Sequence, residues 1–126
     1  MTIRNELKAI GRQVQPIRDK TFGWSKEFYF DATFPVFPGH FPGHPVLPAV
    51  VQILLAELTL EEGRGVSSPI EELLQAKFTT PIIPPCLVLC TVTAGKDGRW
   101  RGILESDGKP CAHILWREDE KTAHIL

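Results

Sequence analysis

The chain has 126 residues, of which 43% are hydrophobic and 23% charged, so it has the composition of a globular protein and the length of one domain. Its formal net charge of -1 argues against a partner bound through phosphate neutralisation, which excludes most nucleic-acid-binding proteins. The first residues lack a signal-peptide pattern, and no stretch reaches the roughly 20 apolar residues that span a bilayer. We therefore expect a single cytoplasmic domain over residues 1–126 that binds neither nucleic acid nor a membrane.

The chain contains three cysteines, Cys86, Cys90 and Cys111. Their odd number and their spacing from the histidines fit neither a set of disulfides nor a metal site. We expect reduced thiols packed in the core. We predict no metal and no redox cofactor.

The N-terminal third favours one helix and then extended chain. Apolar residues at helical spacing lie between Thr2, placed to cap a helix, and Gly11, placed to end it, which predicts a short amphipathic helix within residues 2–13. The region from 14 to 33 is rich in aromatic residues and favours at least one strand.

Residues 35–48 form a stiff loop in this interpretation. Prolines at positions 35, 38, 42, 45 and 48 exclude a helix or an interior strand. The same prolines restrict the backbone, while Gly39 and Gly43 permit unusual backbone angles, so we expect His40 to be held in one orientation. A stiff loop that fixes one side chain is typical of a functional site rather than of a linker between domains.

The most apolar helix follows directly and is predicted over about residues 48–62. Pro48 suits the first helical turn, and either Gly63 or Gly65 can end the helix. Its first three turns have no wide polar face, so we expect the helix to be enclosed by other elements.

The remainder of the chain is predicted to form strands. Alternating residues favour a strand over about 74–82, and an apolar run over 86–93 indicates a strand buried on both faces. Turn signals at 95–98 and at Asp107-Gly108 separate two further strands, over 100–105 and 111–116.

The loop and the following helix suggest carbonyl chemistry. The first N–H groups of a helix lack intrahelical partners and carry partial positive charge, so the amides near Pro48, Ala49 and Val50 can bind an oxygen that gains negative charge. His40 lies shortly upstream, and a neutral imidazole is a suitable base. This combination fits removal of a proton next to the carbonyl of an acyl thioester.

Two stretches resemble a known family. The run His40-Phe41-Pro42-Gly43-His44-Pro45-Val46-Leu47-Pro48-Ala49-Val50 is similar to the signature of the 3-hydroxyacyl-acyl carrier protein dehydratases of the hotdog superfamily, and Ala76–Pro84 resembles that family's strand after the helix. The resemblance covers about residues 31–117. It implies an α+β hotdog fold, in which a curved antiparallel sheet wraps a long central helix, and a dimer whose active sites are built from two subunits.

The same resemblance implies roles for individual residues. His40 would take the C2 proton of a 3-hydroxyacyl thioester, and the backbone N–H of Ala49 would hold the thioester oxygen. The implied partners are an acyl thioester, carried on the phosphopantetheine of an acyl carrier protein, and further copies of the chain in a homodimer or a dimer of dimers. The predicted substrate-binding residues are Phe41, Gly43, His44, Pro48 and Leu54.

One departure from the family pattern concerns the acid. The family places a Glu or Asp fourteen residues after the histidine, where this chain has Leu54. Three residues remain open as replacements: Glu57 further along the helix, Gln52 as a group that positions water or the hydroxyl, and His44 from the loop. Glu57 can equally pair with a basic side chain across a dimer.

The missing acid also leaves other functions open. We predict dehydration, with two alternatives: a hotdog thioesterase, or a non-catalytic module that binds acyl groups or a carrier protein. The remaining histidines, His113 and His124, are interpreted as ordinary strand and tail residues.

Overall fold

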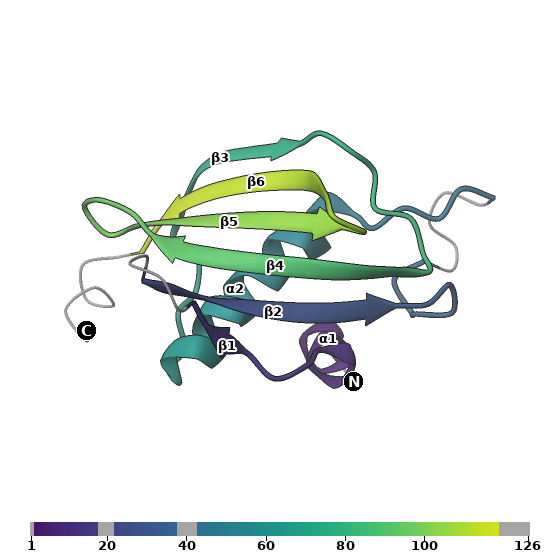
Figure 1. Cartoon of the computed structure of the whole chain (residues 1–126), viewed down its shortest axis with the longest axis horizontal. Helices are drawn as coiled ribbons and strands as arrows, with labels where there is room; N and C mark the ends of the chain where they lie inside the picture. Colours follow the sequence, from purple (N-terminus) through teal and green to yellow (C-terminus); the bar gives the residue numbers. More distant parts are fainter. Residues whose placement is uncertain (1, 18–21, 38–42, 119–126) are drawn as a thin grey trace.

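The computed structural model describes residues 2–17, 22–37 and 43–118, which form one antiparallel sheet and two helices (Figure 1). The sheet has six strands in the order β1-β2-β4-β5-β6-β3. Helix α2 lies against one face of this curved sheet, as the sequence predicts. The helices are α1 (Ile3–Ile10) and α2 (Ala49–Arg64), and the strands are β1 (Gln15–Pro16), β2 (Gly23–Phe30), β3 (Glu72–Phe78), β4 (Cys86–Ala94), β5 (Arg99–Ser106) and β6 (Lys109–Arg117).

Helix α2 begins one residue later and ends two residues later than the predicted range of about 48–62. Pro48 is the N-cap, and Gly65 ends the helix in the left-handed region with φ 75°. Gly63 lies within the helix, where a side chain would collide with Trp24, whose Cδ2 would lie 2.3 Å from an added Cβ. Of the two predicted stops, Gly65 is therefore the one used.

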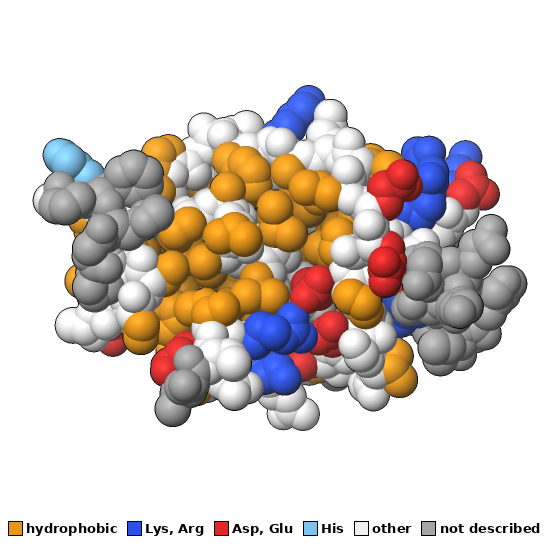
Figure 2. Space-filling model, turned by 180° about the vertical axis from the view of Figure 1, so that it is seen from behind, with side chains coloured by type: hydrophobic (Ala, Val, Ile, Leu, Met, Phe, Trp, Pro, Cys, Tyr) orange, Lys and Arg blue, Asp and Glu red, His pale blue; other side chains and the backbone are white. Residues whose placement is uncertain are grey.

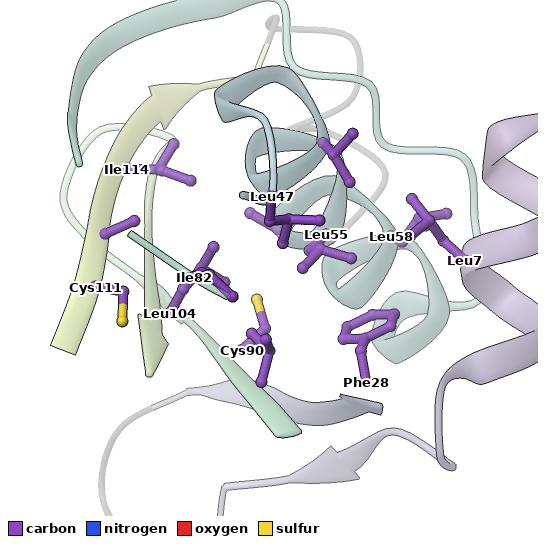
Figure 3. Close-up of a cluster of buried hydrophobic side chains, with 14 of the residues drawn as sticks. Leu7, Phe28, Leu47, Leu55, Leu58, Ile82, Cys90, Leu104, Cys111 and Ile114 are labelled. Carbon is purple, nitrogen blue, oxygen red and sulfur yellow. The ribbon is translucent and has the colours of Figure 1, made fainter. Parts of the chain in front are cut away.

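The core lies between α2 and the sheet. Figure 3 shows Leu47, at the start of α2, in the same cluster as Leu55 and Ile82. Full burial of one such side chain contributes about 1.5–3 kcal/mol to folding. Gly102 of β5 allows close packing here, since an added Cβ would lie 3.1 Å from the Cβ of Ala56.

Two expectations about burial need correction. Helix α2 is not enclosed within the single chain, because Val50 is 72% exposed. Strand β4 is fully buried on one face only: Val88 and Cys90 are inaccessible, whereas Leu87 and Leu89 on the opposite face are half-buried. The half-buried outer residues of β4 lie between the neighbouring strands β2 and β5, and among the described residues no helix covers this face of the sheet (Figure 1).

Strand β3 forms the edge of the sheet and is shorter than predicted. It ends at Phe78 because the next two N–H groups, of Thr79 and Thr80, both turn to the carbonyl of Cys111. A register shift between Leu73 and Gln75 interrupts its pairing with β6. The two predicted hairpins are confirmed, with both central residues of the Asp107-Gly108 turn at positive φ, as such tight turns require.

The N-terminal helix is confirmed as α1, with Thr2 accepting a hydrogen bond from the N–H of Asn5. All three cysteines are buried as free thiols. Burial raises the pKa of Cys86 to about 11 and that of Cys90 to about 12. Neither helix in the described part of the chain has the length and hydrophobicity needed to cross a membrane.

Candidate active site

The loop that enters α2 is fixed by the segment that follows β3. The N–H of Leu47 donates to the carbonyl of Ile82 over 2.9 Å. Leu47 itself is buried, so the loop cannot move at this point without exposing an apolar side chain. The predicted base His40 and its neighbour Phe41 lie outside the described residues.

The first turn of α2 presents free backbone donors. The carbonyl of Pro48 accepts from the N–H groups of Val51 and Gln52, each over 3.1 Å, and no side chain caps the helix. The N–H groups of Ala49 and Val50 precede these bonds and have no partner among the described residues. Together with the helix dipole, they create a region of positive potential that favours an oxygen bearing negative charge.

These donors adjoin a mainly apolar cavity of about 280 Å³. One side is formed by the start of α2 and the preceding loop, and the other by the end of β3 and the residues after it. From the first set, the sequence predicted Pro48, Ala49 and Gln52 as site residues but not Val46 and Leu47, and it predicted none of the second set. The lining residues are Val46, Leu47, Pro48, Ala49, Gln52, Phe78, Thr79, Thr80 and Pro81.

Gln52 is the one fully buried polar side chain in this lining, with 4% exposure. Its Nε2 donates to the carbonyl of Leu47 over 3.0 Å. Its Oε1 is also buried, and no described residue donates a hydrogen bond to it. The cavity wall therefore contains Ala49, with one of the two free N–H groups, and an amide with a free acceptor.

A family model described as ApeI-like, ApeI dehydratase, matches residues 17–112 of the sequence. The chain belongs to the ApeI-like dehydratase family. No curated protein matches this member of the family. The match covers the histidine loop, α2 and most of the sheet, and it identifies the chain as an enzyme of the hotdog dehydratase type.

Solved structures support the fold. The dehydratase heterocomplex ApeI:P from Xenorhabdus doucetiae matches with a TM-score of 0.71 and 21% identity, over 82% of this chain and 97% of that chain. The putative thioesterase yhdA from Lactococcus lactis matches with a TM-score of 0.70 and 14% identity, over 94% and 97% of the two chains. The dehydratase domain of the CurK module of curacin polyketide synthase matches with a TM-score of 0.60 and 14% identity, over 91% of this chain and 44% of that one.

These likenesses confirm the predicted α+β hotdog fold. They include both dehydratases and a putative thioesterase, and the identities are low. The fold by itself therefore does not distinguish the two reactions. The assignment to the dehydratase type rests on the family match.

Glu57 lies in an ion pair rather than in the cavity lining. One carboxylate oxygen accepts from Arg4 of α1 over 2.5 Å, and the other accepts from the N–H of Ile70 over 2.9 Å. The sequence suggested a basic partner across a dimer, but Arg4 belongs to the same chain. Both oxygens are thus engaged in holding α1 and the segment before β3 against α2.

Some of the other predicted site residues line the cavity and some do not. Pro48 and Ala49 line the cavity. Gly43 has φ 81°, and His44 beside it is exposed and absent from the lining. Leu54 is partly buried against the core and is also absent from the lining. Their predicted roles in binding and catalysis remain predictions.

The residues that sequence reasoning missed, Phe78 to Pro81, follow β3 directly. Their only signal was the resemblance of Ala76–Pro84 to the family strand, which did not show that this strand's end faces the helix. Within the described residues, no group of three His, Cys, Asp or Glu side chains could hold a metal ion.

Proposed function

We propose that this chain dehydrates 3-hydroxyacyl thioesters to 2-enoyl thioesters, with the acyl group carried on the phosphopantetheine of an acyl carrier protein. The observation that carries the proposal is the uncapped start of α2 beside an apolar cavity, directly after the His40 motif, in a member of a dehydratase family. Acyl chains bind apolar walls, and the free N–H groups suit a thioester oxygen.

In the proposed reaction, His40 removes a proton from C2 of the substrate. Charge then develops on the thioester oxygen, which accepts a hydrogen bond from the N–H of Ala49. The electron pair of the broken C–H bond forms the C2–C3 double bond as the C3–O bond breaks. The departing oxygen takes a proton and leaves as water.

The departing C3 oxygen needs a proton donor. Leu54 cannot donate a proton, and both oxygens of Glu57 are engaged by Arg4 and by a backbone N–H. After removing the C2 proton, His40 is an imidazolium and can itself protonate the departing oxygen. A second chain is the other possible donor.

We propose that a second chain covers the α2 side of the molecule. Figure 2 shows a broad area of hydrophobic side chains on this side. Isolated exposed leucines are ordinary, but a contiguous apolar area is typical of an interface. The exposed large hydrophobic residues of α2, β3 and the segment after β3 are Val50, Leu73, Leu74, Phe78 and Ile83.

The identity of this second chain determines the acid. In a homodimer both copies contribute the same residues, so a partner copy brings another Leu54. A related but different chain can instead contribute a carboxylate. The similar structure from Xenorhabdus doucetiae is a dehydratase heterocomplex, which makes a complex with a different chain a specific alternative to the predicted homodimer.

The test is a dehydration assay on the purified chain with a 3-hydroxyacyl carrier protein, measured as 2-enoyl absorbance. We expect turnover, and we expect His40→Ala to remove it. Turnover by this chain alone places the proton donor within it, whereas turnover only after addition of a second chain places the donor in the partner. Undiminished dehydration by His40→Ala contradicts the proposal.

Leu54 at the acid position favours two alternative functions. A hotdog thioesterase would release free thiol from acyl thioesters without forming an enoyl product, and a thiol assay across chain lengths tests this. A non-catalytic binding module would bind acyl groups without turnover and would tolerate His40→Ala.

A further inference from the structure

The side chain of Gln52 divides into two functional halves. Its Nε2 donates to the carbonyl of Leu47, which can only accept, so the amide orientation follows from the contact. Its Oε1 is then the free end, buried and without a donor among the described residues. An unsatisfied buried acceptor costs about 1–3 kcal/mol of stability, so the position calls for a functional reason.

The free acceptor lies near the free donors. Gln52 follows Ala49 by three positions, so the two residues share a face of α2. Helical side chains lean towards the N-terminus, and the bond from Gln52 back to Leu47 shows that this one does. The start of α2 thus offers backbone N–H groups and a carbonyl oxygen at one end of the helix.

The remaining lining combines apolar surface with two hydroxyl groups, those of Thr79 and Thr80. Thr79 already donates its hydroxyl to the carbonyl of Cys111 over 3.3 Å. Phe78 and Pro81 present apolar surface. A ligand that satisfies the donors and the acceptor together must carry one oxygen that accepts and, close to it, a hydroxyl or amide that donates.

We propose that Oε1 of Gln52 accepts a hydrogen bond from the C3 hydroxyl of the substrate and thereby selects 3-hydroxyacyl groups over saturated and 3-oxo acyl groups. This inference rests on the proposed function. The thioester oxygen and the C3 hydroxyl are separated by three carbons, so such a substrate carries an acceptor and a donor close together, as the free groups at the start of α2 require. A saturated chain leaves Oε1 unsatisfied, and a 3-oxo group places a second acceptor against it.

The same contact favours elimination. A hydroxyl that donates its hydrogen to Oε1 directs its lone pairs elsewhere, where they remain free to receive a proton. Gln52 does not titrate, so it positions the leaving group without supplying the proton. Its Nε2 bond to Leu47 keeps the amide in place whether or not ligand is bound.

The experiment measures binding of three unreactive pantetheine amides that carry a 3-hydroxyacyl, a saturated or a 3-oxoacyl group of equal length. We expect the wild-type protein to bind the hydroxy ligand about tenfold more tightly than the other two, as for one neutral hydrogen bond in a buried site. Gln52→Met should bind all three within about twofold of one another. The matched control is Gln75→Met on the exposed strand β3, which should retain the wild-type preference.

A wild-type preference below about threefold, or a preference that persists in Gln52→Met, overturns the inference. Circular dichroism shows whether Gln52→Met folds; if it does not, Gln52→Asn, which withdraws the amide by one methylene, replaces it with the same expected loss. Dehydration that depends on His40 without any hydroxyl preference overturns this inference and leaves the proposed function intact. A hydroxyl preference lost in the variant, in a protein without dehydration activity, contradicts the proposed function instead and supports the role of Gln52.

Discussion

The two ends of α2 differ in how their polar groups are used. In the C-terminal half every charged residue is paired with a residue from outside α2, and Gly65 caps the helix. In the N-terminal half there is no charged residue, no side-chain cap and one buried amide with a free oxygen. The ion pairs of the C-terminal half are Arg4 with Glu57 and Glu61, Lys26 with Glu62, and Arg64 with Glu118.

This difference shows why the helix lacks an obvious acid. All three of its carboxylates lie in the half that anchors α1, β2 and the segment before β3. The half beside the cavity keeps only backbone donors and Gln52. The helix is therefore anchored by its C-terminal half, residues 57–64, which we call the anchored end. Its N-terminal residues 49–52 are free to contact a ligand and form the open end.

The largest effect is expected from breaking the anchored end. Arg64 and Glu118 have side-chain exposures of 0% and 3%, and the guanidinium lies 5.2 Å from the ring centroid of Trp100. Glu118→Ala leaves a buried cation without its carboxylate, which should lower the free energy of unfolding by about 3–5 kcal/mol in urea titrations. Glu72→Ala, at an exposed pair with Arg117, is the control and should cost less than about 1 kcal/mol. Equal losses of unfolding free energy in the two variants would contradict the distinction between the buried and the exposed ion pair.

At the open end of α2, the substitution Ala49→Pro removes one backbone N–H group. Ala49 is the first residue of α2, where proline is well tolerated, and Pro48 already has the extended backbone, ψ 149°, that must precede a proline. Ala49→Pro should fold normally but lose about 10²–10³ in kcat, as when an oxyanion donor is deleted. The dehydration assay and a thermal melt together check this. A variant with unchanged kcat would exclude this N–H as the oxyanion donor.

The absent acid can be supplied experimentally. Leu54→Glu places a carboxylate at the position where the family carries one, and we expect dehydration by the purified chain to rise about tenfold or more. Glu57→Gln is the matched variant: it should weaken the contact with Arg4 and lower the melting temperature, yet leave the rate within about twofold. A large loss of rate in Glu57→Gln, with no gain in Leu54→Glu, would make Glu57 the acid.

The sequence predicted what depends on local signals. Pro48, Gly65 and the Asp107-Gly108 turn each act through their own backbone angles: the turn is confirmed, Pro48 precedes the helix by one residue as its N-cap, and Gly65 is one of the two predicted stops. The sequence left Gly63 and Gly65 as alternative stops, because the contact that explains the glycine at 63 is made by Trp24 of a distant strand. The partner of Glu57 was missed for the same reason, since Arg4 is 53 residues away.

For the candidate site, the sequence indicated Ala49 and Gln52 but not the opposite wall. That wall depends on where β3 ends, and β3 ends where Thr79 and Thr80 turn to a carbonyl of β6. A contact of this kind depends on the register in which two strands pair, and the pattern of residues along the sequence does not specify that register. The free oxygen of Gln52 is likewise visible only once Nε2 has a known partner.

The smallest expected effect lies at the N-terminal cap of α1. The hydroxyl of Thr2 accepts from the N–H of Asn5 over 3.3 Å at an exposed position. Thr2→Ala should lower the free energy of unfolding by about 0.5–1 kcal/mol, and Thr2→Ser should restore most of it. Because α1 contacts the anchored end of α2 through Arg4, both variants should retain the wild-type dehydration rate. A change in rate would show that α1 also influences the open end.

The three buried thiols give the protein an internal reporter of its own opening. A thiolate is the form that alkylating reagents attack, and Cys90 has a pKa of about 12 with no accessible surface. Near neutral pH it can be labelled only after the sheet and α2 separate. The rate of Cys90 alkylation therefore measures how often the core opens, and mass spectrometry can compare that rate with and without a bound acyl ligand.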